Sequence, residues 1–309
     1  MIDYQTALSA LRQASACSLT SFREGQWEAI EALVKKNKKV LVVQRTGWGK
    51  SLVYFLATFL LRRQGHGPTL IISPLLALMR NQIEAATRLG LKAASINSTN
   101  RPDWDESFAR LRQNQIDLLL ISPERLANES FVRQHLTPIA TTLGLLVVDE
   151  AHCISDWGHD FRPDYRRLRE VLRRIPDTVP VLATTATAND RVIADIREQL
   201  GRGIVIQRGP LRRDSLRLQT HRLPSQAERL AWLAESLPHL PGTGIIYTLT
   251  RSDAERVSAW LHSRGIDAPA YYSDVSDPTS GESYRQRLEE HLLANRIKAL
   301  VATSALGMG

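Results

Sequence analysis

Short apolar runs alternate along this chain with segments in which apolar residues recur at helical spacing. In the first two thirds, seven runs are almost continuously apolar, as expected for parallel strands covered on both faces. These runs are residues 40–43, 69–72, 93–96, 117–121, 145–148, 181–184 and 204–206. Helical spacing lies between them, at residues 27–34, 75–89 and 189–200. The pattern predicts an α/β fold with a doubly wound parallel sheet and right-handed crossovers.

A second βα series follows a stretch that mixes Gly, Pro and charge, residues 208–214, which predicts a hinge. Strands are predicted at residues 216–221, 244–247, 268–271 and 298–303, and helices at 227–237, 252–264 and 282–295. The sequence therefore predicts a first lobe at 1–207, a hinge at 208–214 and a second lobe at 215–309. A buried parallel strand normally leads into a crossover helix, yet the sequence stops at Gly309, so we expect a truncated second lobe.

Composition narrows the class of protein. Hydrophobic residues make up 43% and charged residues 23% of the 309, which is typical of a globular protein. Apolar runs fall short of the roughly 20 residues that cross a bilayer, so no membrane contact is expected. The two cysteines, Cys17 and Cys153, have no neighbours at zinc-ligand spacing, so we expect no zinc, no disulfide and a cytoplasmic setting. The net charge of +8 favours polyanionic partners.

A phosphate-binding loop is predicted where the strand at 40–43 runs into Gln44-Arg45-Thr46-Gly47-Trp48-Gly49-Lys50-Ser51 and then a helix. Backbone N–H groups of such a loop close on nucleotide phosphates, the lysine supplies positive charge, and the Ser51 hydroxyl suits Mg²⁺. Gln44 stands where the general pattern has its first glycine, so a plain glycine-rich connection stays open as an alternative. Trp48 either packs under the loop or is exposed, and we expect packing.

Two adjacent carboxylates, Asp149 and Glu150, follow the apolar strand at 145–148. Asp149 suits Mg²⁺, while Glu150 suits the orientation and deprotonation of an attacking water. An acidic strand end that only caps a helix is the alternative, and the phosphate loop upstream argues against it. His152 is assigned to coupling between the lobes rather than to proton transfer.

These segments resemble superfamily 2 nucleic-acid helicases of the DEAH kind. Residues 153–165, Cys-Ile-Ser-Asp-Trp-Gly-His-Asp-Phe-Arg-Pro-Asp-Tyr, are similar to the aromatic-rich loop that follows this box in RecQ-family DNA helicases. Other segments resemble that family's adenine-sensing, DNA-contacting, coupling and second-lobe motifs: residues 22–26, 73–79, 122–126, 185–187, 244–247 and 302–309. The resemblance covers residue 20 to the end and implies two RecA-like lobes.

The resemblance implies ATP and Mg²⁺ as cofactors, with Gln26 reading the adenine edge. The residues it assigns to nucleotide binding are Arg23, Gln26, Thr46, Gly47, Trp48, Gly49, Lys50 and Ser51. Those it assigns to catalysis are Lys50, Asp149, Glu150 and His152, with Ser51 and Asp149 at the metal.

The same resemblance implies single-stranded DNA and tailed or branched duplex DNA as partners, with movement from 3′ to 5′ in DNA repair or recombination. The residues it assigns to DNA contact or coupling are Ser73, Arg80, Arg125, Trp157, His159, Phe161, Arg162, Thr185, Thr187 and Thr303. Aromatic faces stack on any base, and a neighbouring guanidinium adds a phosphate or cation–π contact. The alternative puts Trp157 and Phe161 in the core, but their polar and glycine neighbours favour exposure.

Two other functions stay open. An RNA helicase or remodeller of the same superfamily is one, and the loop at 156–162 speaks against it. The second is a catalytically silent nucleotide- or nucleic-acid-binding protein. The family's last motif, whose arginine reaches ATP from the second lobe, has no counterpart in these residues, and such arginines are worth about 10³- to 10⁵-fold in rate. The family's zinc module and winged helix also have no counterpart here.

Overall fold

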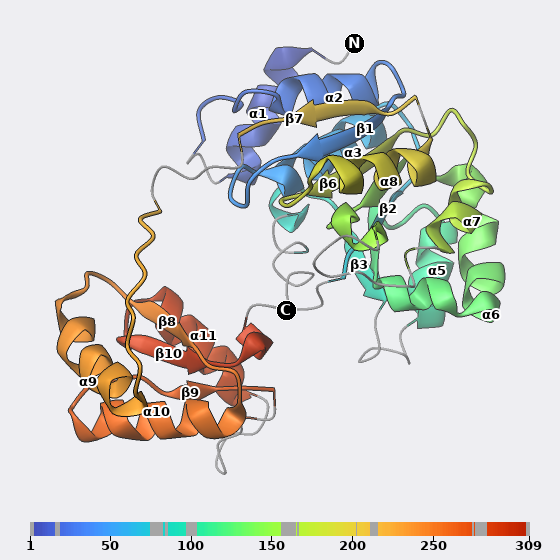
Figure 1. Ribbon diagram of the computed structural model, residues 1–309. Helices are drawn as coiled ribbons and strands as arrows, with labels where there is room; N and C mark the ends of the chain where they lie inside the picture. Colours follow the sequence, from blue (N-terminus) through green and yellow to red (C-terminus); the bar gives the residue numbers. More distant parts are fainter. Residues whose placement is uncertain are drawn as a thin grey trace. The chain divides into compact units, whose positions relative to one another are not determined.

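The computed structural model describes residues 3–15, 19–74, 83, 86–96, 104–155, 165, 167–201, 203–210, 216–273, 275 and 283–306. The chain divides into two compact units, Met1–Ser215 and Leu216–Gly309 (Figure 1). Within the described residues, none of the helices combines the length and the apolar character that a membrane crossing requires.

The first unit contains a seven-stranded sheet in which every pair of neighbouring strands is parallel. Its strands are β1 (Lys39–Val43), β2 (Thr69–Ile72), β3 (Ala93–Ile96), β4 (Leu118–Ile121), β5 (Leu145–Val148), β6 (Val181–Thr185) and β7 (Val205–Arg208). They lie in the order β3-β4-β2-β5-β6-β1-β7. Because β6 lies between β1 and β5, the loops that follow these three strands meet at one edge of the sheet. The predicted fold class is confirmed.

Helices cover both faces of this sheet. They are α1 (Tyr4–Ala14), α2 (Gln26–Val34), α3 (Lys50–Arg63), α5 (Trp104–Arg112), α6 (Glu129–Phe131), α7 (Leu168–Leu172) and α8 (Asp190–Leu200). Local sequence sets where two of them begin: the Asp3 carboxylate accepts from Thr6 N at 2.7 Å at the start of α1, and the Asn189 side chain accepts from Val192 N at 3.0 Å at the start of α8. Such caps satisfy N–H groups that lack a partner within the helix.

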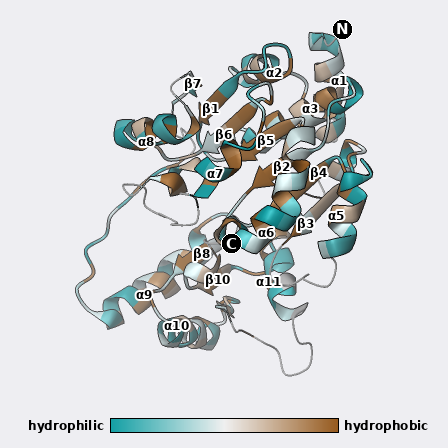
Figure 2. Ribbon diagram, turned by 90° about the vertical axis from the view of Figure 1, so that its right-hand side faces the viewer, coloured by the Kyte–Doolittle hydropathy of each residue, from teal (hydrophilic) through white to brown (hydrophobic). Residues whose placement is uncertain are grey.

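Alternation along the strands divides the core of the first unit in two. In β1, Val40 and Val42 pack with α1, α2 and α3, while Leu41 and Val43 face the other cluster, which includes residues of α5, α6, α7 and α8. Successive side chains of a strand point to opposite faces, so a strand covered on both sides has to be apolar throughout. The hydrophobic strands between helices with hydrophilic outer surfaces are visible in Figure 2.

The second unit has a smaller parallel sheet. Its strands β8 (Gly244–Tyr247), β9 (Ala270–Tyr271) and β10 (Ala299–Ala302) lie in the order β8-β10-β9. Its helices are α9 (Gln226–Ser236), α10 (Arg251–Ser263) and α11 (Ser283–Leu293). Residues of α10 pack against one side of β10, through Ala299 and Val301, and Leu288 of α11 packs against the other.

The structure departs from the sequence predictions at two places. The strand predicted at 216–221 is wrong: residues 216–224 form neither helix nor strand, and Leu218 is 92% exposed. Leucines at alternate positions in this segment match the pattern of a strand. A strand also needs a neighbouring strand to pair with and a hydrophobic core to pack against. The second departure is α5 and α6, for which no helix was predicted. The helix predicted at 75–89 lies mostly outside the described residues.

Candidate functional site at the carboxyl edge of the first sheet

The loop after β1 is shaped by two glycines in the left-handed region. Gly47 has φ 80° and Gly49 has φ 97°, and Gly49 is the residue that caps the start of α3. A Cβ atom at Gly49 would lie 2.6 Å from the Gln26 side-chain nitrogen, so a larger residue would collide there as well as being strained. The two glycines therefore let the loop backbone turn tightly into the N-terminus of α3. Backbone N–H groups and the helix dipole at such an N-terminus favour an anion such as phosphate.

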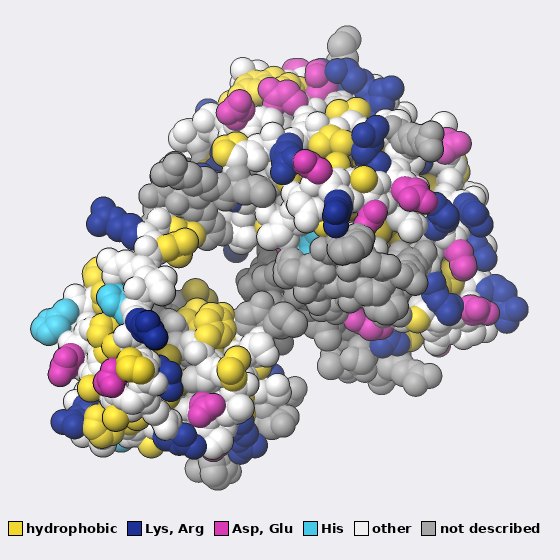
Figure 3. Space-filling view, viewed as in Figure 1, with side chains coloured by type: hydrophobic (Ala, Val, Ile, Leu, Met, Phe, Trp, Pro, Cys, Tyr) yellow, Lys and Arg dark blue, Asp and Glu magenta, His cyan; other side chains and the backbone are white. Residues whose placement is uncertain are grey.

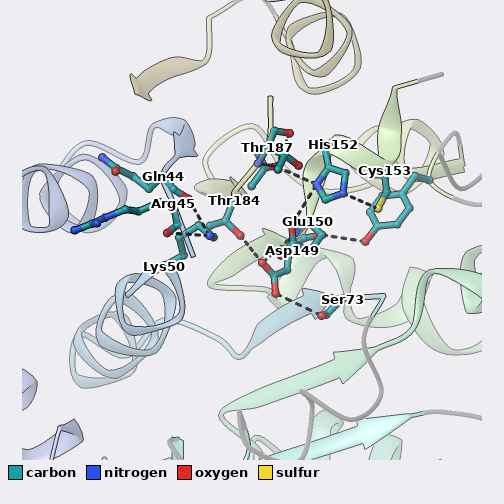
Figure 4. A network of polar contacts seen from close by, with 12 residues as sticks. Gln44, Arg45, Lys50, Ser73, Asp149, Glu150, His152, Cys153, Thr184 and Thr187 are labelled. Carbon is teal, nitrogen blue, oxygen red and sulfur yellow. Dashed lines mark hydrogen bonds and ion pairs between the residues drawn. The ribbon is translucent and has the colours of Figure 1, made fainter. Parts of the chain in front are cut away.

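Lys50 is the first residue of α3 and carries the positive charge of this loop. Its Nζ donates to the carbonyl oxygens of Gln44 at 2.9 Å and Arg45 at 3.5 Å, so the ammonium folds back over the loop (Figure 4). Phosphate oxygens are stronger acceptors for an ammonium than neutral carbonyls, because both partners are then charged. Lys50 is therefore placed to exchange these carbonyls for a bound phosphate.

Asp149 follows β5 and is 7% exposed. Its Oδ1 accepts from the Thr184 hydroxyl at 2.5 Å and from Glu150 N at 3.1 Å. Burial, and then the neighbouring Glu150 charge, raise the pKa of the Asp149 carboxyl, while the Thr184 hydrogen bond and Lys50 act in the opposite direction. Thr184 comes from β6, which lies between β1 and β5, the strands that lead to Lys50 and Asp149, and Figure 4 shows it between these two side chains.

A magnesium ion fits the donor set at this edge. Mg²⁺ prefers oxygen ligands and usually takes one or two protein groups, keeping water and substrate phosphates as the others. Asp149 and the half-buried Ser51, on the first turn of α3, are the residues that would hold it. A cation beside Asp149 would favour the ionised carboxylate that burial disfavours. Among the residues that the structure describes, no group of three or more His, Cys, Asp or Glu side chains forms a closed metal cage.

A polar network leads from the acidic pair to the end of β6. Glu150 has left-handed backbone angles, φ 48° and ψ 48°, which are costly for a residue other than glycine and direct its side chain out of the strand. Its Oε2 lies 3.2 Å from His152 Nδ1, and the same nitrogen lies 3.0 Å from the Thr185 hydroxyl. The Thr185 hydroxyl in turn donates to Thr187 O at 3.1 Å and accepts from Thr187 N at 3.2 Å. The predicted residues Glu150, His152, Thr185 and Thr187 are thus brought together.

Gln26 and Trp48 join α2 to the phosphate loop. Gln26 is 1% exposed, its Nε2 donates to Trp48 O at 2.9 Å, and its Oε1 accepts from Arg23 N at 2.9 Å. The Arg23 guanidinium donates to Gly47 O. Trp48 is 6% exposed and packs in the core, so the prediction that it packs is confirmed. Thr46 is exposed at the loop's tip. Since both ends of the Gln26 amide bind the protein here, its contact with adenine stays a prediction.

Ser73 is buried beside the acidic pair. It follows β2, is 0% exposed, and its hydroxyl lies 3.4 Å from Asp149 Oδ2. Ser73 lies next to Asp149 because β2 pairs with β5, which places the ends of the two strands side by side. In this structure the Ser73 side chain contacts Asp149, and its contact with a DNA phosphate stays a prediction.

Two of the other residues predicted to contact DNA lie in the part of the chain that the structure describes, one in each unit. The Arg125 guanidinium carbon lies 4.8 Å from the centroid of the Trp104 ring, a cation–π contact in the first unit. Thr303 follows β10 in the second unit, and its N donates to Tyr271 O at 3.1 Å. The remaining predicted residues, Arg80, Trp157, His159, Phe161 and Arg162, lie outside the described residues.

Two residues that sequence reasoning missed contribute to the site. Thr184 binds the Asp149 carboxylate, and Tyr165, which is 0% exposed, donates its hydroxyl to Asp149 O at 2.9 Å. The signal for Thr184 was available, since a hydroxyl that ends an otherwise apolar strand needs a partner when it is buried. Tyr165 carries no such signal, because its distance from Asp149 along the chain gives no hint of the contact.

Comparison with known proteins agrees with this geometry. Residues 23–196 match the DEAD/DEAH box helicase family. The chain is 36% identical over its whole length to the ATP-dependent DNA helicase RecQ of Synechocystis sp., covering 63% of that protein. It is 33% identical over 93% of its length to the ATP-dependent DNA helicase RecQ of Bacillus subtilis, covering 47% of it. The chain thus spans about half to somewhat under two thirds of these curated relatives.

Solved structures show the same fold at lower sequence identity. The Mycobacterium smegmatis helicase Lhr, solved with single-stranded DNA and AMP-PNP, aligns with a TM-score of 0.65 at 20% identity, over 96% of this chain and 42% of Lhr. A point variant of Saccharomyces cerevisiae Dbp5, solved with RNA and ADP BeF3, aligns with a TM-score of 0.70 at 16% identity, over 96% of this chain and 74% of that chain.

Proposed function

Because this chain belongs to the DEAD/DEAH box helicase family, with RecQ DNA helicases among its relatives, we propose that it is the motor part of an ATP-dependent DNA helicase. In this proposal single-stranded DNA stimulates ATP hydrolysis, and the hydrolysis drives movement along one strand and separation of duplexes. The direction from 3′ to 5′ and the preference for tailed or branched duplexes rest on the RecQ relationship alone.

The observation that carries the proposal is the meeting of Lys50, Asp149 and Glu150 at one sheet edge, after the nearby strands β1 and β5. Lys50 and the N-terminus of α3 bind the β- and γ-phosphates, and Ser51 and Asp149 would hold Mg²⁺, which would supply positive charge to the phosphate oxygens. Glu150 orients the attacking water and accepts its proton as the water adds in line to the γ-phosphorus, while the bond from that phosphorus to the bridging oxygen breaks and ADP leaves. Thr184 and Ser73 fix the orientation of the Asp149 carboxylate through their hydroxyls.

The coupling to DNA runs through the network around His152. His152 links Glu150 to Thr185, and the segment that follows Cys153 leads directly into the predicted DNA-sensing loop at 156–162. A change in the conformation of that loop when it binds a base would therefore be passed through His152 to Glu150, the residue that orients the water. Coupling of this kind makes hydrolysis depend on DNA without any DNA atom entering the phosphate site.

Charge supports a polyanionic substrate for the first unit. Residues 216–309 contain ten basic and ten acidic residues, so the whole net charge of +8 lies in residues 1–215. Phosphate neutralisation by Lys and Arg releases counterions, which is the main sequence-independent term in nucleic-acid binding.

The test is the steady-state ATPase rate with no nucleic acid, with single-stranded DNA and with RNA of the same length and sequence. The proposal expects stimulation by DNA well above that by RNA. Equal or greater stimulation by RNA would favour an RNA helicase. Binding of ATP and Mg²⁺ without turnover at saturating DNA would identify a catalytically silent binding protein.

A further inference from the structure

Gln44 stands where the general phosphate-loop pattern has a glycine, and the structure shows what its side chain meets. Gln44 is 8% exposed and lies against Gly209, the residue that follows β7. A Cβ atom at position 209 would lie 2.6 Å from Gln44 Cδ and closer still to both ends of the amide. The absence of a side chain at 209 therefore makes room for the one at 44.

The backbone of Gln44 connects two parts of the ATP site. Its N donates to Thr185 O at 3.0 Å, and its carbonyl oxygen accepts from Lys50 Nζ at 2.9 Å. Displacing this residue would move both the carbonyl that holds the lysine and the attachment to the end of β6. Because these contacts are made by backbone atoms of Gln44, we expect its effect to be on the position of Lys50.

The end of β7 contacts three segments of the same site. The Gln207 amide lies 3.2 Å from the carbonyl oxygen of Gly25, the residue that caps the start of α2. Arg208 donates to Asp190 Oδ1 at 2.7 Å and to Ala188 O at 3.4 Å, next to Thr187. Gly209 N donates to Val43 O at 3.1 Å, which fixes its backbone beside the start of the phosphate loop. The second unit begins at Leu216, a few residues further along the chain.

We propose that Gln44 is a positioning residue that pairs with Gly209 and makes the placement of Lys50 depend on the end of β7, the last strand before the second unit. This inference rests on the proposed ATPase function. It extends that function by naming a contact, outside the phosphate-binding groups, through which the chain leading to the second unit acts on the nucleotide site.

A double-mutant cycle on the full chain tests the pair. The variants are Gly209→Ala, Gln44→Ala and the combination, with Gly203→Ala as the matched control, because a Cβ there meets nothing within 4 Å. For each we would measure kcat and KM for ATP with single-stranded DNA, the dissociation constant of a fluorescent ADP analogue with Mg²⁺, and the melting temperature.

Gly209→Ala is expected to lower kcat/KM by about threefold or more, because the new methyl group displaces the Gln44 amide. In the Gln44→Ala background the same change is expected to have little effect, since the atoms it would strike are gone. Gly203→Ala should behave like the unmodified protein.

Equal effects of Gly209→Ala in both backgrounds would overturn the proposal. So would coupling confined to the melting temperature, with kcat, KM and ADP affinity unmoved, because that result identifies a packing contact only. If the unmodified protein shows no DNA-stimulated hydrolysis, the proposed function fails, and the cycle is then decided on the dissociation constant of the ADP analogue.

Discussion

The two units use the same parallel βα architecture and differ in how their strands are covered. In the first, β5, β6 and residues 40–43 of β1 are buried on both faces, while the edge strand β7 is largely exposed. In the second, β8 lies at the edge of a three-stranded sheet, and Ile245 and Tyr247 are 44% and 59% exposed. Hydrophobic side chains are also visible on the surface of this unit in Figure 3. Strands that are packed on both faces hold the residues after them in fixed positions. A site formed by the loops after several strands requires such fixed positions.

Charge follows the same division. The first unit carries all of the net positive charge together with the phosphate loop and the acidic pair, while residues 216–309 are balanced. The comparison indicates that nucleotide chemistry and most of the attraction for polyanions belong to the first unit. The following changes test that division, beginning with the largest expected effect.

Replacing a lysine in each unit gives the sharpest contrast. Both Lys50 and Lys298 donate to two backbone carbonyls, Lys298 to those of Leu240 and Gly242. Lys50→Ala is expected to lower the ATPase rate by at least about 100-fold, because it removes charge aimed at the transferring phosphate. Lys298→Ala should keep most of the rate. Comparable losses in steady-state ATPase assays of the two variants would break the division between the units.

A tryptophan in each unit tests DNA sensing. Trp157→Ala is expected to reduce the stimulation of the ATPase rate by DNA about tenfold, because stacking on a base is worth about 1–3 kcal/mol. The ATPase rate without DNA should stay unchanged. Trp232→Ala in the second unit, whose ring lies 5.0 Å from that of His221, is the matched control. The ratio of rates with and without DNA is the measurement. Full stimulation in Trp157→Ala would show that the sensor has been assigned wrongly.

Two arginines that lie over aromatic rings compare DNA contact in the units. Arg125 lies 4.8 Å from the centroid of the Trp104 ring, and Arg251 lies 4.4 Å from that of Tyr272 and pairs with Glu255 at 2.9 Å. Arg125→Ala should weaken DNA binding and reduce the slope of log affinity against log salt by about one. Arg251→Ala should leave that slope as it was. A slope that changes only in Arg251→Ala would place the phosphate contact in the second unit.

The change in stability on removing the charge of Asp149 is the smallest of the expected effects. Burial raises the pKa of this carboxyl, so its ionised form lowers the stability of the nucleotide-free fold. Asp149→Asn is therefore expected to raise the melting temperature slightly at neutral pH while abolishing magnesium-dependent hydrolysis. The gain should shrink as pH falls through the raised pKa, because the native carboxyl then becomes neutral as well. A variant less stable than the native protein at every pH would contradict this.

Sequence patterns predicted the first unit well where local rules decide the outcome. The strands ending at Val43, Ile72 and Val148 were predicted because double coverage demands continuous apolar runs, and the loops after β1 and β5 carry recognisable phosphate and metal chemistry. Residues 216–221 were mispredicted, since alternation does not reveal whether a pairing partner is present. The contact of Ser73 with Asp149 was missed because it follows from the pairing of β2 with β5, and no local pattern encodes strand order. The buried Thr184 hydroxyl signalled that it needs a partner but not which one, and Tyr165 was missed because it meets Asp149 from a distant part of the chain.

Calorimetric titration of the full chain with a non-hydrolysable ATP analogue, with and without Mg²⁺, tests the central claim most directly. That claim is a magnesium-dependent nucleotide site formed by Lys50, Ser51 and Asp149 at the edge where β1 and β5 end. The account predicts binding at one site per chain that weakens when Mg²⁺ is chelated and that is lost in Lys50→Ala. Absence of binding to the native chain, or equal binding by Lys50→Ala, would contradict it.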